Sequence, residues 1–145
     1  ILGFNGSIWR GFLEFDTSDL AAADTPASGF VLLHVKESFI DGNSWLLTVV
    51  DPDTLVNPLV VSDYGVLLNS VDSKGLESVG RAGLWLMVPL AQDGLDLIVK
   101  GGVTRFGLRS NRDRYSITGE TSDEYAKLDG IYTDYPPRLI VQLAA

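Results

Sequence analysis

The chain has 145 residues, of which 46% are hydrophobic and 21% charged, which is typical of one globular domain and not of a disordered segment. It contains no Cys and one His, which excludes disulfides, Cys nucleophiles and metal sites built from two histidines. Its 19 acidic and 11 basic residues give a net charge of −8, which disfavours nucleic acid as a partner, and no apolar run approaches the ~20 residues of a membrane span.

Short apolar segments separated by Gly and Pro predict strands along the whole chain. In the second of them, Val31, Leu33 and Val35 alternate with Phe30 and Leu32, so that both faces of the strand are apolar. A strand with one wet face should alternate with polar residues, so a second layer is expected over the other face, either a loop of this chain or a neighbouring module or subunit. The predicted strands are, in chain order, 7–16, 29–37, 44–50, 64–70, 84–90, 103–110, 115–118, 124–129 and 138–143.

One segment departs from this pattern. Leu95, Ile98 and Val99 have helical spacing and are followed by Gly101 and Gly102, which predicts a short helix near 91–100 with a glycine stop. The fold class expected from these elements is all-β, a jelly-roll-like antiparallel β-sandwich with one short helix. Because no linker or repeat divides the chain, residues 1–145 are expected to form a single domain.

Catalytic patterns are weak, and the chain is expected not to be an enzyme. His34 lies in the middle of an apolar strand with no nucleophile motif beside it. Glycoside hydrolysis needs two opposed carboxylates, and with this many acids a pair such as Glu14 and Asp16 carries no weight by itself.

Aromatic and basic side chains are the better candidates for binding. Exposed aromatic rings offer flat apolar surfaces to sugars, and Trp9 and Trp45 lie near strand ends, whereas Trp85 is expected in the core. Arg105 and Arg109 share one face of a predicted strand, where they would hold an acidic sugar by paired N–H donors. The alternatives are that the tryptophans pack structurally and that the arginines neutralise neighbouring carboxylates.

Calcium is the one metal that the composition leaves open, and no other cofactor is expected. Its oxygen ligands follow no strict spacing outside the EF-hand. Asp113 lies in an oxygen-rich turn, and Asp123 would approach it if adjacent strands bring the loops together. The alternative is that both are ordinary turn-forming residues.

Five segments over residues 10–143 resemble, in order, the motifs of one known family. They are Gly11–Ser18, similar to R-x-L-L-x-F-D-x-S; Ser28–Val35; Ser62–Gly65; Leu84-Trp85 through Arg109, similar to G-x-T-x-F-x-L-R at its end; and Ser122–Val141, similar to a closing D-x-Y…R-P-x-L-x-V strand. The family that these motifs resemble is that of the DNRLRE-type extracellular modules, which are related to alginate-binding carbohydrate-binding modules and to disaggregatase-related repeats.

The resemblance implies a secreted or cell-surface jelly-roll module without catalytic activity, some relatives of which bind polysaccharide. The chain departs from the family in having only residues 1–10 ahead of the first motif, where relatives have a further strand. The domain is therefore expected either to lack its first strand or to build it from residues 1–10. The expected function is polysaccharide binding or cell-surface adhesion. The alternative is a structural subunit that assembles with other copies of itself into an extracellular filament by strand donation.

Overall fold

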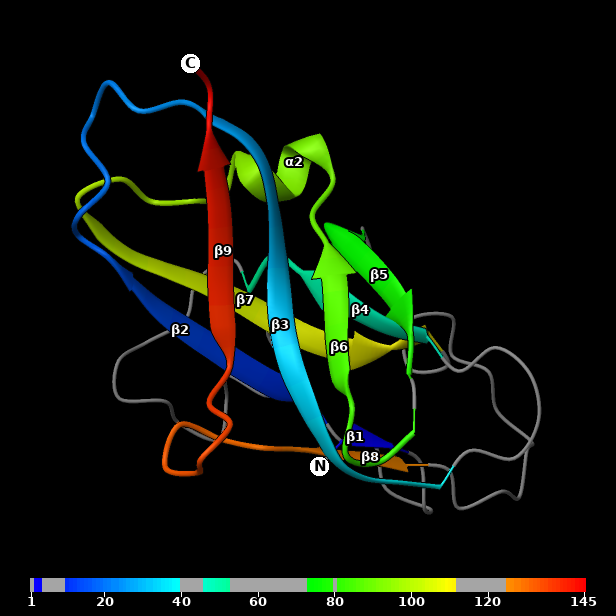
Figure 1. The fold of residues 1–145 in the computed structure, drawn as a ribbon. Helices are drawn as coiled ribbons and strands as arrows, with labels where there is room; N and C mark the ends of the chain where they lie inside the picture. Colours follow the sequence, from blue (N-terminus) through cyan, green and yellow to red (C-terminus); the bar gives the residue numbers. More distant parts are fainter. Residues whose placement is uncertain (1, 4–9, 40–45, 53–72, 80, 112–124) are drawn as a thin grey trace.

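The computed structural model describes residues 2–3, 10–39, 46–52, 73–79, 81–111 and 125–145. These residues form two antiparallel sheets packed face to face, with one short helix at an end of the sandwich (Figure 1). The predicted all-β sandwich with a short helix is therefore confirmed.

The front sheet, nearer the viewer in Figure 1, is built around the long strand β3. Its strands are β1 (Leu2–Gly3), β8 (Tyr125–Leu128), β3 (Pro26–Phe39) and β6 (Trp85–Pro89) in that order, with β9 (Arg138–Leu143) also paired to β3. The back sheet has the order β2 (Gly11–Thr17), β7 (Gly102–Ser110), β4 (Leu46–Val50) and β5 (Gly75–Ser78).

The chain changes sheet repeatedly along its length. It passes from β2 in the back sheet to β3 in the front, returns for β4 and β5, and then alternates through β6, β7 and β8. Together with the two strand orders, this alternation is the connectivity of a jelly roll.

Strands β8 and β9 lie end to end along the same edge of β3. β9 pairs with the first half of β3, with Ile140 opposite Phe30, and β8 pairs with the second half, with Leu128 opposite Val35. They act as one strand interrupted by residues 129–137, which leave the sheet and return to it.

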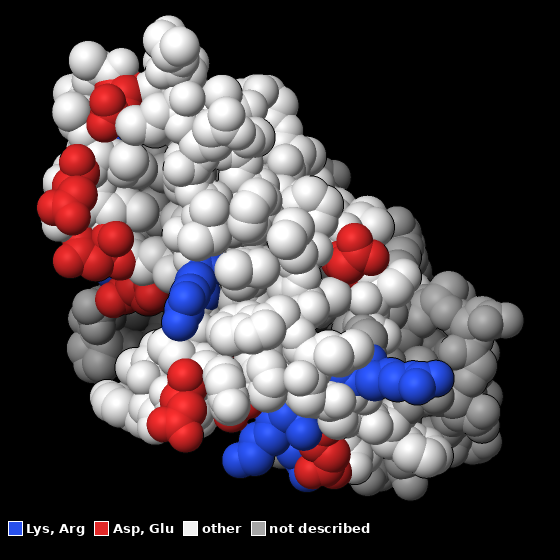
Figure 2. Space-filling view, in the orientation of Figure 1, with Lys and Arg blue, Asp and Glu red and all other residues white. Residues whose placement is uncertain are grey.

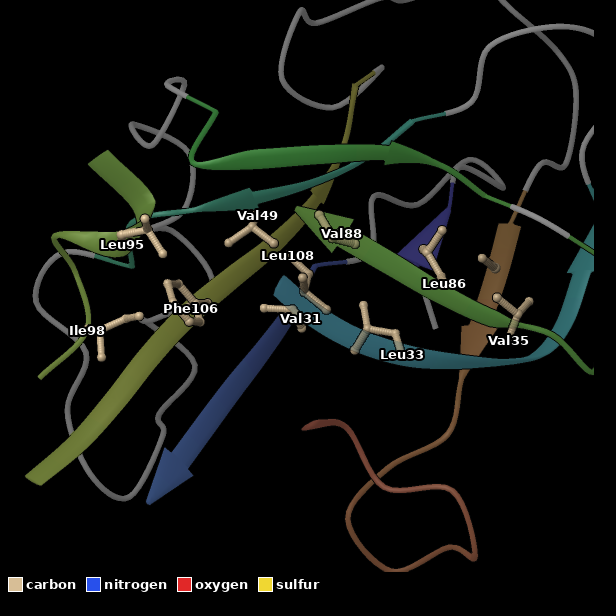
Figure 3. Packing of buried hydrophobic residues seen from close by; sticks show 11 residues of the cluster. Val31, Leu33, Val35, Val49, Leu86, Val88, Leu95, Ile98, Phe106 and Leu108 are labelled. Carbon is tan, nitrogen blue, oxygen red and sulfur yellow. The ribbon is translucent and has the colours of Figure 1, made fainter. Parts of the chain in front are cut away.

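The core lies between the sheets (Figure 3). Alternation along β3 turns Val31, Leu33 and Val35 inward, where each is fully buried. They pack against Phe106, also fully buried, from β7 of the back sheet. The sequence had grouped these three residues on one face, and the structure shows that this face is the inner one.

The predicted helix is present but short. α2 spans Gln92–Leu95 and buries Leu95 against the end of the core, as Ile98 does just beyond it. The following turn includes Gly101 at φ 69°, a left-handed conformation that glycine adopts without strain.

One short strand was missed by the sequence patterns. β5 is four residues long and lacks the apolar alternation on which strand prediction depends. β1, of two residues, lies within residues 1–10, one of the two expected origins of the first strand. β3 also starts earlier and ends later than predicted. The predicted strands at 64–70 and 115–118 lie outside the described residues.

A candidate ligand-binding face on the front sheet

Of the six predicted site residues, the structure describes two. Trp9, Trp45, Asp113 and Asp123 lie outside the described residues. The two arginines are both on β7.

Arg105 and Arg109 differ in their access to solvent. The Arg105 Nε–H donates to Glu14 Oε2 over 2.8 Å across the β2–β7 pair, and the Arg105 side chain is 34% exposed. Arg109 is only 2% exposed. Among the described residues, the pair therefore presents one carboxylate-bound guanidinium to solvent and not an open two-arginine clamp.

The expectation that Trp85 lies in the core is wrong. Trp85 begins β6 opposite His34 of β3, and its neighbour Leu86 is the residue that turns inward. Trp85 is 41% exposed on the outer face of the front sheet. Because 84–88 is apolar at every position, alternation alone did not indicate which set faces the core.

Three aromatic rings meet at this position. The ring centroids of His34 and Tyr135 are 4.3 Å apart and stacked, and those of His34 and Trp85 are 5.4 Å apart, edge to face. Trp85 and Tyr135 lie 6.1 Å apart with their planes at 82°. Such offset and edge-to-face contacts are the favoured arrangements of aromatic pairs. We call His34, Trp85 and Tyr135, together with Arg138, the aromatic cluster.

A buried carboxylate fixes the central ring of this cluster. His34 Nδ1 lies 2.6 Å from Asp129 Oδ2, and the two side chains are only 12% and 8% exposed. An ionised carboxylate only accepts hydrogen bonds, so the proton of this bond belongs to Nδ1. Asp129 comes directly after β8, and its backbone N–H also donates to the His34 carbonyl. Asp129 therefore holds His34 through both its backbone and its side chain.

A cation completes the cluster. Arg138, the first residue of β9, places its guanidinium carbon 5.6 Å from the Trp85 ring centroid. No carboxylate among the described residues forms an ion pair with Arg138. Its five N–H donors are therefore available to a ligand that lies against Trp85.

The cluster lies beside a largely uncharged sheet face. Phe30, Leu32, Met87 and Ile140 share the outer face of β3, β6 and β9 with it, and Met87 is 52% exposed. Figure 2 looks onto this face and shows few charged side chains at its centre, with acidic side chains along the margin where β2 and the following segment lie. The second apolar face expected from the sequence thus exists, and no described layer covers it.

The chemistry that this arrangement offers is recognition. Flat rings, a guanidinium and an imidazole suit a ligand with both C–H faces and polar oxygens. Within the described ranges, no group of three or more His, Asp or Glu side chains is placed to hold a metal ion.

The fold and the face together define an all-β jelly-roll sandwich with an exposed aromatic cluster. Comparisons with family models, with curated proteins and with solved structures return no match to this chain. The resemblance to DNRLRE-type modules therefore stays a prediction from its motifs. In the part of the chain that the structure describes, no helix has the length and apolar character needed to cross a membrane.

Proposed function

We propose that the chain is a non-catalytic, extracellular or cell-surface module that binds polysaccharide through the aromatic cluster. The observation that carries this proposal is the exposure of Trp85 and Tyr135, at 41% and 47%, beside the Arg138 guanidinium, whose N–H groups can donate to sugar oxygens. The part of each ring that folding leaves exposed leaves water only when a ligand covers it.

The angle between the rings favours a single glycan chain over a flat crystalline surface. Rings that lie at 82° to each other cannot both lie flat on one plane. They form instead a corner in which one sugar ring lies against the face of one aromatic ring while its edge meets the other. Arg138 adds donors that suit a carboxylate or hydroxyl group on the same sugar.

Affinity electrophoresis through gels that contain alginate, and through gels that contain a neutral β-glucan, tests the proposal. We expect retardation of the wild type in at least one of them. A buried aromatic contact is worth about 2 kcal/mol or more in a binding site, so Trp85→Ala should weaken binding by roughly 30-fold.

Phe39→Ala is the matched control. Phe39 is an exposed aromatic residue at the end of β3, at 53%, five residues beyond His34, and it stacks on Tyr125 and on no ring of the cluster. Its loss should leave retardation unchanged. Absence of retardation of the wild type in every polysaccharide, or equal losses in the two variants, would refute the proposed site.

A further inference from the structure

Two apolar hollows lie along one open side of the sandwich, away from the exposed face of the aromatic cluster. The larger, of about 430 Å³, lies between β2 and the segment that follows β8, and Leu13, Phe15 and Leu128 line it. The second, of about 300 Å³, continues between β2 and β9, where Leu139 and Val141 line it. Phe15 borders both hollows, so we treat them as one groove, the β2–β9 groove.

The backbone of β9 borders this groove with an unpaired edge. The Gly29 carbonyl accepts from the Leu90 N–H, so Gly29 directs its backbone groups away from β9 and the next residue, Phe30, directs its own toward β9. Ile140, opposite Phe30, therefore bonds to β3. Leu139 and Val141 must direct their N–H and C=O groups the other way, where no described strand pairs with them.

The vacant position is a strand position of the jelly roll. β1 occupies the corresponding place beside β8, but only for the two pairs that join Leu2 to Ala126 and Gly3 to Tyr125. Beside β9 the same place is empty among the described residues. Unpaired edge groups next to an apolar groove are the features that strand addition uses, because the backbone supplies hydrogen bonds and the groove takes alternate side chains.

The charges that line the groove are all acidic. Glu14 and Asp129 line the larger hollow and already have partners in Arg105 and His34. Asp16 and Asp19 line the smaller hollow, and neither forms an ion pair with a described Lys or Arg. The groove therefore complements a basic occupant, and a second copy of this chain, with its net charge of −8, matches it poorly.

We propose that the β2–β9 groove accepts a β-strand of another polypeptide, with apolar side chains at alternate positions and a Lys or Arg at the end that meets Asp16 and Asp19. The added strand pairs with β9 through Leu139 and Val141 and extends the front sheet. The two sites share Asp129, which lines the larger hollow and bonds to His34, but the added strand would pair with β9 and the sugar would lie on the outer face at Trp85, so either proposal can fail without the other.

A synthetic ten-residue peptide of alternating Val and Thr with Lys at both ends is the probe. Amide hydrogen exchange of the protein, followed residue by residue by NMR, reports its binding. The amides of Leu139 and Val141 should exchange rapidly in the free protein and become protected by at least tenfold on addition of the peptide. Those of Ile140 and Gln142, which bond to β3, should be protected in both states and serve as the internal control.

Two peptide controls separate the requirements of the groove. N-methylation of every Val removes the N–H donors that face β9 when the peptide pairs antiparallel, as β1 does with β8, while the Val side chains stay, and it should abolish protection. Replacement of both Lys by Glu should weaken binding by roughly two- to fivefold, the range of an exposed ion pair.

Two protein variants test the location. Val141→Lys puts a charge into the groove and should abolish binding, whereas Ile140→Lys puts the same charge on the opposite face of β9 and should preserve it. Because a core-facing Lys can also impair folding, Asp19→Lys at an exposed site is the second variant, and it should weaken binding by roughly two- to fivefold without change in the melting temperature.

Three results would overturn the proposal. Protection of the Leu139 and Val141 amides in the free monomer would show that the chain itself covers the edge. Protection that rises with protein concentration, together with dimers in sedimentation velocity, would make a second copy the occupant. Failure of the Lys peptide to protect either amide at millimolar concentration would show that the groove accepts no such strand.

Discussion

Removal of the hydrogen bond between His34 and Asp129 should lower the free energy of unfolding, and its length and burial indicate by how much. The Nδ1–Oδ2 distance is 2.6 Å, and the side chains are 12% and 8% exposed, so solvent screens the bond weakly. A hydrogen bond to a charged group contributes about 1.5–3 kcal/mol. Asp129→Ala should therefore lower the free energy of unfolding by about 2 kcal/mol, or about 4–8 °C in Tm for a chain of this size.

A double-mutant cycle isolates the bond from other effects of each substitution. The wild type, Asp129→Ala, His34→Ala and the double variant are unfolded in urea, and the free energies of unfolding are compared. His34→Ala also loses the stacking on Tyr135, and the cycle cancels that loss. What remains is the hydrogen bond itself, so we expect a coupling energy of about 2 kcal/mol. A coupling energy below about 0.5 kcal/mol would refute the assignment of the pair as a fixed structural bond.

The same variant gives a second readout at the binding face. Since His34 lies beneath Tyr135, release of His34 from Asp129 should loosen the corner formed by Tyr135 and Trp85. Polysaccharide affinity of Asp129→Ala should thus fall, although Asp129 itself is 92% shielded from solvent and does not reach the ligand.

Three further predictions concern the fold. Hydrogen bonds, first from Lys127 and then from Tyr125, lower the pKa of Glu37 from its ordinary 4.5, so the ionised carboxyl stabilises the fold at neutral pH and this contribution is lost as the pH falls below 4.5. Glu37→Gln should therefore show a smaller drop in Tm between pH 7 and pH 3 than the wild type. An equal drop would contradict the assignment. Gly75→Ala should cost about 2–3 kcal/mol in urea unfolding, because the added Cβ would lie 2.4 Å from the Pro89 carbonyl oxygen; a cost under about 0.5 kcal/mol would argue against this close approach. Phe106→Ala, at a fully buried position, should cost about 3–5 kcal/mol, and retention of wild-type stability by calorimetry would contradict its central place in the core.

The alternation of the sequence grouped side chains by strand face, but where both faces are apolar it did not say which face is buried. Alternation in β3 assigned Val31, Leu33 and Val35 to one face, and the structure buries all three. The same rule failed for Trp85, because Leu86 and Met87 are also apolar and the pattern offers two equivalent registers. The pairing of β6 with β3 selects one of these two registers, and this pairing cannot be read from the sequence of β6 alone.

The candidate site was predictable only in its chemistry. The sequence singled out tryptophan and arginine as residue types and named Trp9, Trp45, Arg105 and Arg109, whereas the described cluster is formed by Trp85, Tyr135 and Arg138. Trp85 and Arg138 are 53 positions apart in the chain, and His34 precedes Trp85 by 51 positions. Only the pairing of the strands brings these residues together. Asp129 ended the predicted strand 124–129, and its bond to His34 left no local signal in the sequence.

Residues 129–137 interrupt the strand formed by β8 and β9, while the pairing of both parts with β3 holds the sheet together. Asp129 and Tyr135 belong to the excursion at 129–137, and Arg138 begins the strand after it, whereas β3 continues unbroken past both halves. If the polysaccharide proposal holds, replacement or lengthening of residues 130–134, between Asp129 and Tyr135, would change the surroundings of the cluster while β3 keeps β8 and β9 in register. A library randomised at 130–134, on an otherwise constant scaffold, would show whether sugar preference follows this segment.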